Sequence, residues 1–151
     1  MKPILLAAGL AIGAAGPAEA ASNGAAIFDN NCALCHQEGG VGVPGQFPRL
    51  AGRVGTIAAK PQGRHYLPEV VLNGMSGRIK VDGEDILGLM PSFSGLSDSD
   101  IAAVLTFVSG LGNTKAAPFT AKDIAAVRVH ALSPGAVAAE RARLVRAKIV
   151  P

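Results

Sequence analysis

The sequence predicts an all-α protein with one short β-like segment and a helical C-terminal extension. Three observations lead to this fold class. Residues 101–108 carry apolar side chains at helical spacing. Residues 78–81 alternate polar and apolar and run into Asp82-Gly83, a hairpin-turn signal. Helix-capping patterns at Thr120 and Ser133 begin two further helices near the end of the chain.

Residues 1–20 have the organisation of a secretory signal peptide. An apolar stretch over residues 4–15 precedes Ala18-Glu19-Ala20, an A-x-A cleavage site, so we expect cleavage after Ala20 and a periplasmic location in a bacterium. The apolar stretch is too short to cross a bilayer, and no later stretch is longer. The sequence therefore predicts no transmembrane segment in the mature chain.

The remaining chain is expected to form one domain over residues 21–114 with an appended extension over residues 115–151. The chain has no Trp and only 4% aromatic residues, which is little for a core of this size and suggests that a large flat cofactor fills the interior. Residues 21–120 carry seven Lys/Arg against eight Asp/Glu, whereas residues 121–151 carry six against two. The net charge of +3 is thus a property of the extension.

The helical elements can be placed in chain order. A short helix is expected over residues 23–32, with Ile27 and Phe28 on its apolar side, and a glycine-rich loop follows over residues 39–45. A second helix is expected near residues 67–73, with Pro68 in its first turn and Gly74 at its end.

Three more helices are expected after the β-like segment. The first follows the capping pattern Ser97-Asp98-Ser99-Asp100, the second runs from Ala121 through about Leu132, and the third starts after Ser133-Pro134. The third is amphipathic, and its arginines and lysine lie mostly outside the apolar side formed by Val137, Leu144, Val145 and Ile149.

Both cysteines of the chain lie in Cys32-Ala33-Leu34-Cys35-His36, which has the C-x-x-C-H pattern of covalent haem attachment. Cysteines at i and i+3 share one helical face, so both sulfurs can reach the two vinyl groups of one porphyrin. A disulfide would leave His36 unused, and a zinc site lacks further ligands. A thioredoxin-like pair would need a βαβ setting that the sequence does not show.

Three motifs in order resemble those of class I monohaem cytochromes c. They are C-A-L-C-H at 32–36, F-P-R-L-A-G at 47–52 and L-M-P-S-F-S-G-L-S-D-S-D-I at 89–101, and the resemblance covers about residues 24–112. It implies a small helical shell around one covalently held haem c, and an electron carrier rather than an enzyme. A haem enzyme or a gas-binding sensor with an open sixth iron position is the alternative function.

The second axial ligand of the iron, opposite His36, is expected to be Met90. Met90 precedes Pro91, whose fixed φ suits an irregular loop, and it resembles the distal methionine of the family. Met75 is interpreted as a flexible residue packed against the haem. His65 is assigned a surface or packing role, and His130 an exposed position in the extension.

The resemblance also implies supporting roles for other residues. The carbonyl of Pro48 would accept a hydrogen bond from the ring of His36, and Leu50 would pack on the haem. Gly24, Phe28 and Phe107 match the positions at which the terminal helices of the family cross.

The insertion before Met90 is similar to that of cytochromes that serve periplasmic quinoprotein-type dehydrogenases. We therefore expect a periplasmic dehydrogenase as electron donor and an oxidase or another cytochrome as acceptor. The basic extension is expected either to dock on a partner enzyme or an anionic membrane surface, or to pack back on the haem domain. The sequence has no glycine-rich phosphate loop, catalytic Ser/His/Asp set or nucleic-acid signature.

Overall fold

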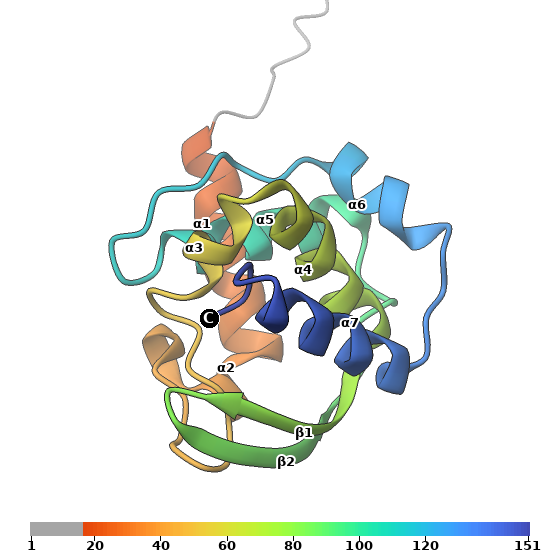
Figure 1. Ribbon diagram of the computed structural model, residues 1–151. Helices are drawn as coiled ribbons and strands as arrows, with labels where there is room; N and C mark the ends of the chain where they lie inside the picture. Colours follow the sequence, from red (N-terminus) through yellow and green to blue (C-terminus); the bar gives the residue numbers. More distant parts are fainter. Residues whose placement is uncertain (1–16) are drawn as a thin grey trace, which may run out of the picture.

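The computed structural model describes residues 17–151, and the side chains from residue 23 onward. Of the predicted signal peptide, residues 1–16 lie outside the described residues, and residues 17–20 belong to the first helix. The predicted class is confirmed, because the fold is mostly helical with one two-stranded hairpin (Figure 1). In chain order the elements are α1 (Pro17–Asn31), α2 (Ala33–His36), a 3₁₀ turn (Glu38–Gly40), α3 (Val54–Ala58), α4 (Pro61–Asn73), β1 (Met75–Val81), β2 (Glu84–Met90), α5 (Asp98–Gly110), α6 (Ala121–Arg128) and α7 (Pro134–Arg146).

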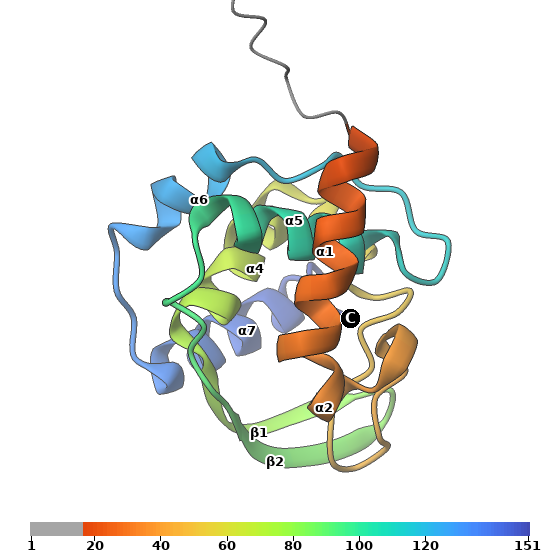
Figure 2. The ribbon, with the colours of Figure 1, turned by 180° about the vertical axis from the view of Figure 1, so that it is seen from behind.

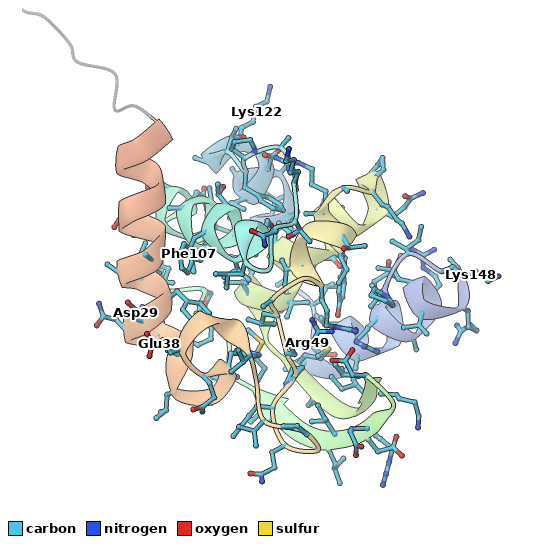
Figure 3. All side chains as sticks on the ribbon, turned by 90° about the vertical axis from the view of Figure 1, so that its left-hand side faces the viewer. Asp29, Glu38, Arg49, Phe107, Lys122 and Lys148 are labelled. Atoms are coloured by element: carbon cyan, nitrogen blue, oxygen red, sulfur yellow. The ribbon has the colours of Figure 1, made fainter. Side chains whose placement is uncertain are left out.

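Helices α1 and α5 cross at close range on the side of the molecule seen in Figure 2. Gly24 lies at the crossing, where a Cβ atom would collide with the carbonyl of Ala103. One turn further along α1, the ring of Phe28 packs against Phe107 of α5 with 5.6 Å between ring centroids. Phe107 is labelled in Figure 3. The three residues expected at this crossing are therefore found there.

Helix α4 begins earlier than the sequence predicted. Its N-terminal proline is Pro61, and Pro68, expected in the first turn, lies inside the helix. An internal proline removes a helical hydrogen bond and normally breaks the helix. Here the helix continues because its flanks are packed: Tyr66 and Leu67 are buried in the core, and Gly63 lies against Ile57 of α3.

The β-like segment is a complete antiparallel hairpin, which forms the lower edge of the molecule in Figure 1. Asp82 and Gly83 form its two-residue turn, both with positive φ (52° and 88°), as a primed turn requires. Met90 was expected on an irregular loop, and that prediction is wrong, because Met90 is the last residue of β2 and pairs with Met75. The strand ends at Met90 because Pro91 cannot continue a hydrogen-bonded ladder.

The C-terminal extension packs back on the rest of the molecule. The caps at Ser97, Thr120 and Ser133 are present as predicted, although α6 ends at Arg128, short of Leu132. Ile124 of α6 and Leu144 of α7 are completely buried, and they belong to the same hydrophobic core as Phe28. Helix α7 lies along α4 and β1 (Figure 1).

Over residues 17–151, we find no helix that combines the length and the apolar character needed to span a bilayer.

Candidate haem site

The two cysteines lie where α1 passes into α2. The amide N–H groups of Cys35 and His36 both donate to the carbonyl of Cys32, at 3.2 and 2.9 Å, so one helical turn brings the residues together. Both thiols are free. Burial, and secondarily the charge of Cys35, raises the pKa of the Cys32 thiol to about 11. A redox-active pair of the thioredoxin kind has a lowered thiol pKa, so this site differs from it.

His36 is buried, and its ring is held by the loop that follows α2. Its Nδ1 atom lies 2.9 Å from the carbonyl oxygen of Pro48. Because a carbonyl can only accept, Nδ1 carries the proton and Nε2 keeps its lone pair. Burial lowers the pKa of His36, against the opposite effect of the Pro48 hydrogen bond. The imidazole is therefore neutral at pH 7, as a metal ligand must be.

A sharply folded loop places Pro48. The N–H of Gly42 donates to the carbonyl of His36 at 2.8 Å, and Val43 and Phe47 pair as an isolated antiparallel bridge. Gly42 has φ of 70°, and a Cβ atom there would meet the backbone of Phe47 and Arg49. The glycine allows the chain to turn back so closely that Pro48 reaches the histidine.

Two adjoining hollows, of about 140 and 280 Å³, lie beside His36. They share several lining residues and so form one elongated, mainly apolar space. The shared residues are Cys32, His36, Pro48, Met75, Ile79, Met90 and Phe93. Leu50 lines the first of the two hollows.

The face of the hairpin that lines this space carries two glycines, Gly77 and Gly88, and therefore has no side chains at its centre. Alternate residues of the two strands face one side, and the register pairs Met75 with Met90, Gly77 with Gly88 and Ile79 with Ile86 on it. A Cβ atom at either glycine would touch nothing within 4 Å. The paired glycines thus leave room for a flat group between the methionines and the isoleucines.

The residues present fit a covalently held haem. The space has two thiols at its edge, a neutral imidazole, two thioethers and apolar walls, and bare backbone where a planar ring can approach. When bound, haem supplies an iron that changes oxidation state by one electron. Cys32 and Cys35 would supply the sulfur tethers, while the imidazole and the thioethers are available as iron ligands and the apolar walls would exclude water.

The two methionines have different surroundings. The hydroxyl of Tyr66 donates a hydrogen bond to the sulfur of Met75, with 3.6 Å between the oxygen and sulfur atoms. Among the residues that the structure describes, the Met90 sulfur has no such partner. His65 and His130 are exposed and do not line the hollows, so the structure does not bring them to the site.

The sequence interpretation overlooked two buried arginines, Arg53 and Arg141, in the wall of the first hollow. A signal for Arg141 was present, because Val137, Arg141 and Leu144 have the spacing i, i+4, i+7 of one helical face. No comparable pattern marked Arg53.

Comparisons with known proteins agree with this geometry. The sequence model of the family described as Cytochrome c matches residues 21–112. The chain is 44% identical over 149 residues to cytochrome c-552 of Thermus thermophilus, which covers 95% of each chain.

Two more distant relatives are longer chains, and this chain matches less than a quarter of each. One is the cytochrome c subunit of the quinone alcohol dehydrogenase of Gluconobacter oxydans, 35% identical over 108 residues, which are 70% of this chain and 22% of that subunit. The other is the gluconate 2-dehydrogenase cytochrome c subunit of Pantoea cypripedii, 32% identical over 108 residues, which are 70% of this chain and 24% of that subunit.

Proposed function

The chain belongs to the cytochrome c family, and on that premise we propose that it carries single electrons in the periplasm through a haem iron held between His36 and Met90. Family membership and the single Cys32/Cys35 pair make it an electron-transfer protein with one covalent haem c. The axial pair, the compartment and the partners are the proposed parts.

We choose Met90 over Met75 as the iron ligand because of the surroundings of the two sulfur atoms and the sequence around Met90. Both methionines line the same space as His36, so position alone does not separate them. The Met75 sulfur already accepts a hydrogen bond from Tyr66 through one of its two lone pairs, whereas both lone pairs of the Met90 sulfur are left for the iron by the residues that the structure describes. Met90 also stands in the L-M-P sequence that resembles the distal segment of the family.

Ligation by both an imidazole and a thioether suits electron transfer. The soft sulfur stabilises ferrous iron and raises the reduction potential. With both axial positions filled by the protein, dioxygen and peroxide find no open position on the iron. Electron exchange then needs little rearrangement, which favours a carrier over a haem enzyme or sensor.

Replacement of each methionine by alanine tests the assignment. We expect Met90→Ala to lose the weak long-wavelength absorption band that a sulfur ligand gives to ferric haem, and to bind carbon monoxide in the ferrous state. The ferric spectrum of Met75→Ala should keep the band, because this residue only packs beside the site. Loss of the band in Met75→Ala but not in Met90→Ala would assign the ligand to Met75 instead. Ready binding of carbon monoxide by the wild-type protein at pH 7 would contradict the carrier function.

Two observations support a periplasmic carrier that accepts electrons from a dehydrogenase. The family match begins at residue 21, directly after the expected cleavage site. Two relatives are cytochrome subunits of dehydrogenases, and an oxidase or another cytochrome is the proposed acceptor. Mature chain that starts at Ala21 in the periplasmic fraction, and its reduction by a quinoprotein dehydrogenase of the same cell, would support the proposal. Uncleaved chain in the cytoplasm would overturn it.

A further inference from the structure

Arg141 of α7 is a buried cation in the wall of the haem space. Its residue is only 7% exposed, and its side chain lines the same hollow as His36 and Met90. One hydrogen bond holds it, from Nη2 to the carbonyl oxygen of Lys80 in β1 at 3.0 Å. A guanidinium has five N–H donors. Among the described residues, no other acceptor takes one of them.

No carboxylate neutralises Arg141 within the described part of the chain. The adjacent Glu140 pairs with Arg143, at 2.6 Å between oxygen and nitrogen, and makes no ion pair with Arg141. Arg53, on the same hollow, adds a second positive charge. Arg53 itself has a partner for its charge, because it donates to the Asp82 carboxylate at 3.0 Å and also to the main-chain oxygen of Pro151 at 2.6 Å.

A buried charge without a partner is costly, and guanidinium does not lose its proton in proteins. An anion that enters this end of the hollow would therefore be bound strongly. Carboxylate is the group whose shape best matches the fork of N–H donors. The cofactor of this space carries such groups, because haem has two propionate side chains.

We propose that Arg141 binds a haem propionate, so that the C-terminal extension is part of the haem site. The geometry places the required donor on α7, which lies outside the family match of residues 21–112. Arg141 then links helix α7 both to the main-chain carbonyl of Lys80 in the hairpin and to a propionate of the haem. The role depends on the covalent haem and is independent of which methionine binds the iron.

The pH dependence of the reduction potential tests this role. An ionised propionate stabilises ferric iron, so the potential falls as pH rises through the propionate pKa. Arg141, helped by Arg53 and Arg49 on the same hollow and opposed by Asp82, keeps that pKa low. We expect a nearly flat profile between pH 5 and 8 in the wild-type protein.

In Arg141→Gln we expect the inflection to move up by about one pH unit or more into this range. The potential at pH 8 should also fall below that of the wild type, because a positive charge near the iron is lost. Arg141→Lys should keep most of the wild-type profile. Arg143→Gln is the matched control, since Arg143 lies on the same helix, pairs with Glu140 and is 57% exposed; its profile should not change.

If Arg141 only tied α7 to Lys80, Arg141→Gln would lower the stability of the protein without moving the inflection of its potential. An unchanged profile in Arg141→Gln would therefore overturn the proposal. Nuclear Overhauser contacts in the ferrous wild-type protein give a second test that does not need the variant to fold. Contacts between the Arg141 side chain and propionate methylene protons are expected, and their absence would equally overturn it. The sulfur-ligand absorption band and carbon monoxide binding report on axial ligation separately, so failure here leaves the carrier function intact.

Discussion

His36 shows how a single side chain acquires its chemistry from its neighbours. The motif predicts an axial histidine, but the tautomer depends on the acceptor at 2.9 Å, the carbonyl of Pro48. That acceptor is presented only because the loop folds tightly at Gly42. The orientation of the His36 ring therefore depends on this loop keeping its fold.

Gly42→Ala should lower the free energy of unfolding by more than the 1–2 kcal/mol that is roughly the cost of a left-handed conformation alone. The added Cβ atom would also collide with the backbone of Phe47 and Arg49. Gly45→Ala is the control, because φ there is 71° but a Cβ atom would meet nothing within 4 Å. Urea denaturation of the holoprotein measures both. Equal losses in the two variants would show that the collision is relieved by movement of the loop.

At the scale of residues, the sequence was informative where chemistry fixes the spacing. Cys32, Cys35 and His36 need one helical turn, so the motif identified them without a structure. The Pro48 acceptor followed from the family resemblance, and the structure places it at the ring of His36. Arg141 was visible on an apolar helical face, yet its burial depends on which surface that face contacts.

At the scale of elements, the hairpin determines where both methionines lie. A two-residue turn at Asp82-Gly83 sets the register of every pair, so Met75 must face Met90 if both strands extend that far. The turn was recognised from the sequence, but the strand length was not, because Gly77 and Gly88 interrupt the alternating pattern. Axial ligation by Met90 stays a prediction.

The hairpin turn is held by an ion pair that pH can break. Asp82 accepts hydrogen bonds from Arg49 (Figure 3) and Arg53, and the bond from Arg49 contributes most to the lowered pKa of Asp82. A lowered carboxyl pKa stabilises the fold above the ordinary value of about 3.9, and this contribution is lost as pH falls through the lowered pKa. The wild-type protein should thus lose its advantage over Asp82→Asn below about pH 4.

Thermal midpoints at pH 6 and pH 2.5 measure this advantage. Asparagine tolerates the positive φ of 52° at this position, so the turn itself survives the substitution. Asp85→Asn is the control, since Asp85 pairs with Lys80 at 3.8 Å and both side chains are more than half exposed. A difference between wild type and Asp82→Asn that is the same at both pH values would rule out the ion pair as its cause.

At the scale of the whole molecule, one core joins the haem domain and the extension. The sequence predicted the apolar side of the last helix. An apolar side of this kind could pack either on a partner protein or on the molecule's own haem domain. The structure resolves this, because Val137 and Leu144 are fully buried against the domain while Lys122 and Lys148 extend into solvent (Figure 3). The extension should therefore unfold together with the domain.

Leu144→Ala tests this cooperativity. Leu144 is completely buried, so the substitution should cost about 2–5 kcal/mol through lost apolar contacts and the cavity left behind. Val145→Ala, one residue further along α7 and 39% exposed, should cost about 1 kcal/mol or less. Guanidinium denaturation should be followed by far-ultraviolet circular dichroism and by haem absorbance.

Both probes should shift to the same lower midpoint in Leu144→Ala, because the helix and the haem space share one core. Separate transitions, with circular dichroism changing first, would mean that α7 detaches while the haem site persists. The shared core makes the first outcome the expected one, since detachment of α7 would expose Val137, Leu144 and the part of β1 that α7 contacts.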